Sequence, residues 1–416
     1  MASAAEPRPE NFGREMVAIP RYRPHEGPVI LSAGFRPFFL GAALWAALGI
    51  PLWLAAYAEG MALPSGLPPA VWHAHEMVFG FAAATVAGFL LTAIPNWTGR
   101  LPLQGGGLAV LVLLWAAGRA GVLFSAGLGA PIAALFDLSF PAVFAAVVAR
   151  EIVAGRNWRN LPMVAALSLL FAGNLLVHLE ALGVAETAQL GNRIGIATLL
   201  MLISLVGGRI IPSFTRNWLV KSRPGVRPPT AESGFDRTVL IVTALALVAW
   251  AAVPDARVSA VADLVAGGAL LIRLLRWQGV HTMREPLLIV LHVGYAWLAL
   301  GLLFLGVDHF YEVLPATAAL HALTVGAIGT MTLAVMTRAT LGHTGRSLVA
   351  GPWTTAIYSL ITLAALLRVL APSAGAEYVT ALWVAGAAWS GAFLLFAVCY
   401  GQVLLQPRVR GEAAPI

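Results

Sequence analysis

The residues of this sequence best suited to metal or redox chemistry are two histidines and a glutamate at the head of a long apolar stretch. The segment from Trp72 to Arg100 reads WHAHEMVFGFAAATVAGFLLTAIPNWTGR, so His73, His75 and Glu76 precede enough apolar residues to cross a bilayer. Ionisable groups beside a hydrocarbon span are costly and persist where they bind, pair or carry protons. Since imidazoles and carboxylates are common ligands of metals, the pattern indicates redox or metal chemistry before simple transport.

The composition is that of a polytopic membrane protein. Of the 416 residues, 59% are hydrophobic and 11% are charged, whereas a soluble domain carries about 25% charged residues. The single cysteine, Cys399, excludes an intrachain disulfide, a CxxC redox motif and a cysteine-ligated cluster. The net charge of +7 comes from arginines in short loops, which is typical of membrane topology and does not indicate a nucleic acid partner.

Apolar runs of about 20 residues predict an all-α fold with about twelve transmembrane helices. We expect residues 31–405 to form a single twelve-helix transmembrane domain, with a flexible cytoplasmic tail at 1–30 and a second cytoplasmic tail at 406–416. The predicted spans lie near 36–58, 72–95, 107–126, 131–150, 161–183, 190–212, 237–254, 258–277, 286–306, 313–338, 352–371 and 378–403.

The basic residues predict the orientation of these spans. With the N-terminus inside, all of the 26 basic residues fall on the inner side except Arg119, Arg193, Arg257 and Arg368. Cytoplasmic loops carry such an excess of Lys and Arg, and the bias therefore predicts an N-in, C-in topology with an even number of spans.

Several histidines converge in the outer half of this predicted bundle. Counting 1.5 Å per helical residue from the span ends, we place His73, His75, His178, His309 and His321 there. Convergence of imidazoles from different spans predicts a binding site on the outer side.

Two of these histidines suit the axial positions of a haem. Placing span 72–95 on span 313–338 without a gap aligns His75 with His321 and Gly80 with Gly326. A haem held between helices takes one histidine from each, so we predict His75 and His321 as the axial ligands. The two glycines leave room either for the macrocycle or for close helix contact. A looser third copy near span 190–212 suggests three units of four helices.

The remaining outer histidines predict a second site. His73 and His75 are two residues apart and point about 200° away from each other on a regular helix. His73 and Met77 share a face, and imidazole with thioether is a ligand set for copper. Either His178 or His309 would complete it. Met77 equally fits a packing role, and His178 equally fits a hydrogen bond between helices.

Three further charged residues fit supporting roles. Glu76 is predicted either to carry protons or to hold a ligand imidazole in place. Arg119 and Asp137 lie at similar depth on adjacent antiparallel spans, which predicts a buried ion pair. The pair serves either to hold the two helices in register or to act beside a cofactor.

Four segments resemble the NnrS family: GFRPFFL at 34–40, WHAHEMVFGF at 72–81, PNWTG at 95–99, and HALTVGAIGTMTLAVMTRATLGHTGR at 321–346. The resemblance extends over nearly all twelve predicted spans. It implies a multi-pass protein of the bacterial inner membrane that contains haem b and copper and is associated with denitrification and with defence against nitric oxide and nitrosative stress. The ligand residues named above are inferred from their positions and not from the family.

The span number and the four-helix units also resemble the catalytic subunit of the haem–copper oxidases, in which histidines of the second and tenth helices hold a low-spin haem. His75 and His321 lie in the corresponding spans. The oxidases carry further histidines on their sixth and seventh helices, and this chain has none in those spans. A complete oxidase-type binuclear centre is therefore not expected.

The sequence leads to one function hypothesis and two alternatives. The first is a haem- and copper-binding membrane protein that binds or converts nitric oxide or metal-nitrosyl species; if it is an enzyme, haem-dependent turnover would need an external electron donor such as quinol. The second is a transporter for a metal or metal complex that uses the outer histidines, and it predicts a polar pathway continuing inward. The third is a cofactor-free assembly factor. Membrane lipid is a partner in all three.

Overall fold

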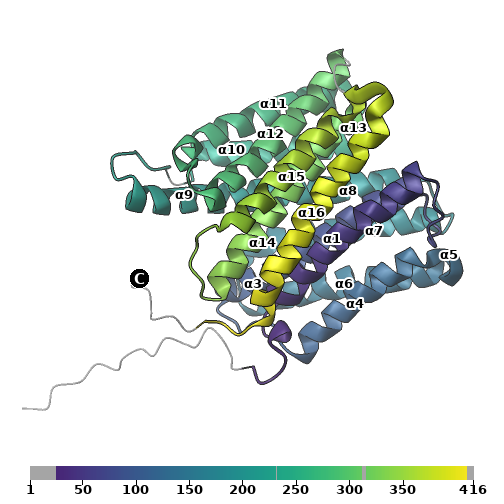
Figure 1. Cartoon of the computed structure of the whole chain (residues 1–416), viewed down its shortest axis with the longest axis horizontal. Coiled ribbons are helices and arrows are strands. Elements are labelled where there is room, and N and C mark those ends of the chain that lie inside the picture. Colours follow the sequence, from purple (N-terminus) through teal and green to yellow (C-terminus); the bar gives the residue numbers. More distant parts are fainter. Residues whose placement is uncertain (1–24, 231, 312–314, 410–416) are drawn as a thin grey trace, which may run out of the picture.

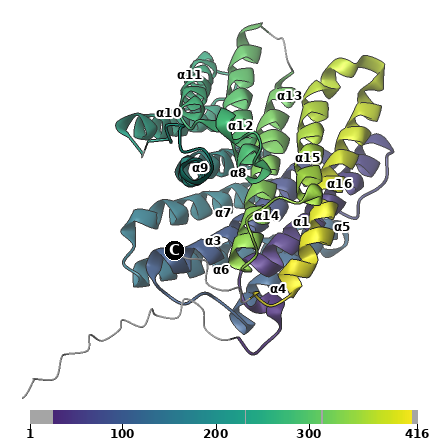
Figure 2. The same cartoon turned by 60° about the vertical axis from the view of Figure 1, so that its left-hand side comes forward.

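The computed structural model describes residues 25–230, 232–311 and 315–409, and these residues contain helices and no strand. Most helices run side by side along one common direction (Figures 1 and 2). The predicted tails at 1–30 and 406–416 lie largely outside the described residues. The predicted all-helical membrane fold is confirmed, because eleven helical segments are long and apolar enough to cross a membrane.

The last of the eleven segments contains two helices. It spans Pro352–Leu405, but η7 (Ala371–Glu377) turns the chain at Gly375, where φ is 54°. The helices on either side, α15 (Pro352–Leu370) and α16 (Tyr378–Leu405), pack against each other. The described residues therefore form twelve crossings, as predicted.

The other crossings follow in chain order, with short helices in the connections. They are α1 (Phe35–Ala58); α2 (Pro69–His75), η2 (Glu76–Ala82) and α3 (Ala83–Thr98); α4 (Gly106–Leu123); α6 (Ala130–Ala154); α7 (Leu161–Ala181); α8 (Ala188–Leu202), η4 (Ile203–Gly207) and α9 (Gly208–Ser222); α10 (Gly234–Ala252); α11 (Arg257–Leu275); α12 (Pro286–Tyr311); and α13 (Ala316–His321), η6 (Ala322–Gly329) and α14 (Thr330–His343). The connections contain η1 (Val29–Leu31), α5 (Ser125–Leu128), η3 (Trp158–Asn160) and η5 (Gly279–Thr282).

The first and last crossings lie side by side, with the start of α1 beside the end of α16 (Figure 1). Arg36 Nη1 donates to the carbonyl oxygens of Leu404 at 2.5 Å and Gln406 at 2.8 Å. The first helix therefore begins at the same end of the bundle at which the last helix ends, which agrees with an even number of crossings.

Three crossings contain a stretch of π-helix. These stretches are η2, η4 and η6, in the second, sixth and tenth crossings. η2 begins directly after His75 and η6 directly after His321. Because π turns are rare, their recurrence every four crossings supports an internal repeat of four-helix units.

The three π-helical stretches meet around one cavity. Ala82 of η2, Ile203 of η4 and Ile328 of η6 all line an apolar cavity of about 90 Å³ near the middle of the bundle. Equivalent elements of the repeat thus surround a common centre.

The two glycines aligned by the repeat serve close packing. A Cβ on Gly80 would lie 2.6 Å from Arg119 Nη1, and a Cβ on Gly326 would lie 2.6 Å from the indole of Trp297. Of the two predicted uses, room for a macrocycle or close contact, the structure has close contact at both positions.

Candidate functional site

The WHAHEM residues lie at the junction of α2 and η2, where the helix widens from α to π geometry. His73 and His75 are both helical, so they point to different sides of the crossing. Each histidine therefore belongs to a different set of neighbours.

His75 lies in a buried polar cluster centred on Asp137 of α6. His75 Nε2 lies 3.1 Å from Asp137 Oδ2 and 2.8 Å from Asn174 Oδ1. Asn174 Nδ2 donates to the same Asp137 oxygen at 2.8 Å, and His178 Nε2 lies 2.9 Å from it. All four side chains are buried. Two crossings, containing α2 and α7, thus direct polar groups to one carboxylate oxygen of α6.

Arg119 of α4 joins two carboxylates of this cluster. Its Nη1 donates to Glu76 Oε2 at 2.6 Å, and its Nη2 donates to Asp137 Oδ1. Trp45 Nε1 also donates to Glu76 Oε2, at 2.7 Å. The predicted contact between Arg119 and Asp137 is present, and it extends to Glu76. Such partners are what buried charges require.

The hydrogen bonds of His75 indicate its protonation. Its Nδ1 lies 2.9 Å from Glu76 Oε1, and its Nε2 faces Asp137. If both carboxylates are ionised, both ring nitrogens must donate, so His75 carries two protons. The charges of Glu76, Asp137, Arg119 and His75 then sum to zero, which is the favourable state for a buried set.

The same cluster offers a set of metal ligands. His75, Asp137 and His178 each present one ligand atom, and these atoms all lie within 4.8 Å of one another. Two imidazoles and one carboxylate form a common site for a first-row transition metal. The Glu76 carboxylate on the other nitrogen of His75 matches the partner that metal-bound histidines usually have.

A small pocket lies beside His178 near the predicted outer end of the bundle. It has a volume of about 90 Å³ and is lined by His178, by Ser125 of α5 and by Gly66 in the loop before α2. Ser125 Oγ accepts from Gly66 N at 2.8 Å. The pocket lies at the end of the bundle where α4 ends and α6 begins, and His178 borders both this pocket and the Asp137 cluster.

His73 faces a separate cavity of about 270 Å³, which also contains His321 of α13, Met77 and Arg368 of α15. The His73 ring stacks on Trp53, with centroids 4.2 Å apart and planes at 21°. Its Nδ1 is buried without a hydrogen-bond partner among the described residues. The cavity is therefore mainly apolar but holds two imidazoles and a guanidinium.

His321 presents one nitrogen to this cavity. Its Nδ1 lies 2.6 Å from the Thr317 carbonyl oxygen, so Nδ1 carries the proton and donates it. Nε2 is then the nitrogen with a free lone pair. A backbone carbonyl on the other nitrogen is a frequent arrangement for a metal-bound histidine.

In the structure, the predicted ligands lie together in other combinations than the sequence suggests. His75 and His321, predicted as a haem pair, do not line one cavity: both nitrogens of His75 are held in the Asp137 cluster, whereas His321 shares its cavity with His73. Met77 does share a cavity with His73, as expected. His178 and His309 do not join them. His178 lies beside Asp137, and His309 lies near the end of α12 against the ring of Phe310.

Three residues of these sites were not singled out as candidates from the sequence. Asn174 is four residues before His178 on one face of α7, a spacing that could have revealed it. Arg368 stood out as one of few outer arginines. Trp45 gave no signal, because a tryptophan in an apolar span is ordinary.

Comparison with known proteins assigns the chain to a family. The family model described as NnrS protein matches residues 29–408, and so it covers every crossing and both histidine sites. No curated protein matched the chain.

Proposed function

Because this chain belongs to the NnrS family, we propose that it is a haem- and copper-binding protein of the bacterial inner membrane that binds or converts nitric oxide or metal-nitrosyl species. The observation that carries the proposal is the divergence of two histidines on one crossing. His73 faces a cavity with His321, while His75 lies with His178 and Asp137. One helix thus serves two sites of different chemistry.

The cavity between His73 and His321 fits the needs of a haem in its donor set. It offers an unpartnered buried nitrogen on His73, a free nitrogen on His321, and Arg368, a guanidinium suited to a haem carboxylate. We therefore propose that His73 and His321, in place of the pair His75 and His321, would hold the haem. Haem iron, when bound, supplies the affinity for nitric oxide.

The size of the cavity sets a condition on this proposal. Its volume of about 270 Å³ lies just below the range of about 300–1,000 Å³ that is usual for small-molecule sites. It adjoins the central apolar cavity, since Leu199 and Ile328 line both. The two cavities together would offer an apolar surround for the haem macrocycle, with the imidazoles and Arg368 at one side.

The Asp137 cluster offers three candidate ligand atoms for copper, whereas His73 and Met77 offer two. Two imidazoles and a carboxylate suit Cu(II), whereas imidazole with thioether suits Cu(I). Since Glu76 holds the second nitrogen of His75 at 2.9 Å, a metal ion would replace the proton that His75 Nε2 shares with Asp137.

The cluster also suits proton handling at the outer side. His178 lies between the outer pocket and Asp137, and His75 connects Asp137 with Glu76. A proton that enters through the pocket can therefore pass along His178, Asp137 and His75 by hydrogen bonds alone. Reduction of nitric oxide consumes protons, so such a path would support it.

The transporter alternative is less favoured. It requires a polar pathway from the outer histidines to the inner side. The central apolar cavity lies between the outer histidines and the inner end of the bundle. Its lining is almost entirely apolar, with Thr85 and Thr332 as its hydroxyl groups. An ion or charged complex would lose its hydration there without replacement ligands.

The test is the absorption spectrum of the purified full chain, recorded with and without nitric oxide. We expect a Soret band in the protein as isolated and a shift of that band when nitric oxide is added. A protein supplied with haem during expression but lacking a Soret band would refute the haem proposal. A band that nitric oxide leaves unchanged would refute the proposed ligand.

A further inference from the structure

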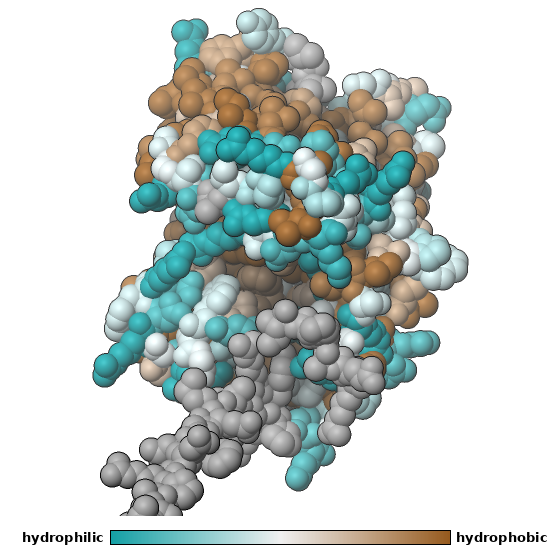
Figure 3. Space-filling model, turned by 90° about the vertical axis from the view of Figure 1, so that its left-hand side faces the viewer, coloured by the Kyte–Doolittle hydropathy of each residue, from teal (hydrophilic) through white to brown (hydrophobic). Residues whose placement is uncertain are grey.

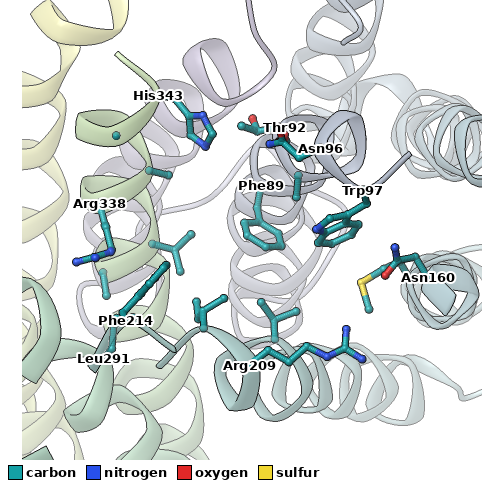
Figure 4. Close-up of a pocket in the computed structure, with 18 of the residues that line it drawn as sticks. Phe89, Thr92, Asn96, Trp97, Asn160, Arg209, Phe214, Leu291, Arg338 and His343 are labelled. Carbon is teal, nitrogen blue, oxygen red and sulfur yellow. The ribbon is translucent and has the colours of Figure 1, made fainter. Parts of the chain in front are cut away.

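A cavity of about 670 Å³ lies at the predicted inner end of the bundle, opposite the end that holds the outer histidine sites. It is lined where α3 and α14 end and α7 begins, by Asn96, Trp97, Asn160 and His343 among others (Figure 4). Figure 3 shows hydrophilic residues gathered across this end of the molecule, above a recess with hydrophobic residues at its depth.

The lining of this cavity is positively charged. Arg159, Arg209 and Arg338 line it, and no Asp or Glu does. Arginines are expected at the inner ends of spans. These differ because they face a cavity, and because neither Arg159 nor Arg209 has a hydrogen bond or ion pair within the described ranges. A guanidinium in a recess without an anion is a ready site for one.

The arginines approach from different sides. Figure 4 shows Arg209 beneath Trp97, directed toward Asn160, and Arg338 on the opposite side near Phe214. The Arg338 guanidinium lies over the Phe214 ring, 4.1 Å from its centroid. Arg209 is therefore available for a ligand, whereas Arg338 is held on an aromatic face.

Between the charged groups the cavity is aromatic and aliphatic. Phe89 and Trp97 pack edge to face, with centroids 6.3 Å apart, and Leu291 and Ile210 continue the apolar wall. An inorganic anion would contact the arginines but leave this wall in water. The lining fits a ligand that has an acidic group and an apolar body.

We propose that this inner cavity binds an amphipathic organic anion, with its phosphate or carboxylate group at Arg209 and Arg159 and its apolar part against Phe89, Trp97 and Phe214. Two sources share this chemistry: the headgroup region of an anionic lipid in the inner leaflet, and a soluble aryl or acyl phosphate. The proposal is independent of any metal or haem at the outer sites.

The test measures binding of defined probes to the purified full chain in a neutral detergent by isothermal titration calorimetry. The probes are dihexanoyl phosphatidylglycerol, dihexanoyl phosphatidylcholine and phenyl phosphate. We expect saturable binding of at least one anionic probe, weakened by salt, and weaker binding of the zwitterionic lipid. Binding of phosphatidylglycerol alone assigns the site to lipid, and binding of phenyl phosphate assigns it to a soluble anion.

Variants identify the cavity as the site. Arg209→Gln and Arg159→Gln should each weaken binding about 10-fold, because each removes a charge-assisted hydrogen bond. Arg237→Gln is the matched control, since Arg237 is an exposed arginine near the start of α10 that does not line the cavity. All three positions are exposed, so the variants should fold. Absence of saturable binding, equal binding of the zwitterionic lipid, or an equal loss in Arg237→Gln would overturn the proposal.

Discussion

Replacement of Arg119 by leucine tests whether the buried cluster behaves as one electrostatic unit. Arg119 donates to Glu76 at 2.6 Å and to Asp137, and all three side chains are buried. Its removal leaves two buried carboxylates that have lost their shared guanidinium partner and that both remain in contact with His75. Removing one partner of a buried ion pair costs about 3–5 kcal/mol, which corresponds to a change of about a hundredfold or more in the folding equilibrium.

The assay is unfolding of the full chain in mixed micelles of neutral detergent and dodecyl sulfate. Arg100→Leu is the control, because Arg100 forms an ion pair with Glu151 while its side chain is 43% exposed. Loss of such a pair should cost about 1 kcal/mol or less. Combining Arg119→Leu with Glu76→Gln and Asp137→Asn should restore much of the lost stability, since His75 then releases its second proton and the buried set is again neutral.

Two results would refute this reasoning. One is a cost for Arg119→Leu no larger than that for Arg100→Leu. The other is a triple variant that is less stable than Arg119→Leu, because the carboxylates would then not be the source of the destabilisation.

The remaining predictions concern packing and metal content. Gly80→Ala should lower the free energy of unfolding by about 1–3 kcal/mol, because its Cβ would lie 2.6 Å from Arg119 Nη1. In the control Gly106→Ala the Cβ meets no atom within 4 Å, so this variant should unfold like the parent protein. Equal unfolding midpoints for the two variants would contradict the close packing at Gly80. His178→Ala should lower the bound transition metal per chain to less than about half by elemental analysis, since it removes one of three ligands. His309→Ala should leave the metal content unchanged, and a loss there would show that the metal lies elsewhere.

Much of the fold follows from the sequence, because the bilayer restricts the choices. Apolar runs must be helices that satisfy their own hydrogen bonds, and the arginine distribution fixes their direction. Depth along a helix is then simple arithmetic, which is why His75 and His178 could be placed in the outer half and Asp137 at the depth of Arg119. The spacing of His73 and His75 also predicted that they face apart, and the structure has them in different sites.

The pairing of His75 with His321 shows what the sequence could not supply. The two residues are equivalent in the repeat, and each directly precedes a π-helical stretch. When repeated units surround a centre, equivalent residues occupy equivalent positions in different units. They need not contact each other, and His75 and His321 lie in different sites. The rotation of each crossing decides this, and it depends on packing such as that of Gly326 against Trp297.

The sequence is compatible with two roles for Glu76, proton transfer and support of a ligand imidazole. In the structure it contacts His75, Arg119 and Trp45 together. Only the fold reveals this, because Arg119 and Trp45 belong to other crossings and their contact with Glu76 has no periodic signal in the sequence.

If one crossing serves two cofactor sites, as we propose, His73→Ala and His75→Ala should have opposite effects on cofactor content. Haem and transition metal are quantified per chain in both variants. We expect His73→Ala to lose most of its haem and keep its metal, and His75→Ala to keep its haem and lose most of its metal. Loss of haem from His75→Ala with retention in His73→Ala would contradict the proposal.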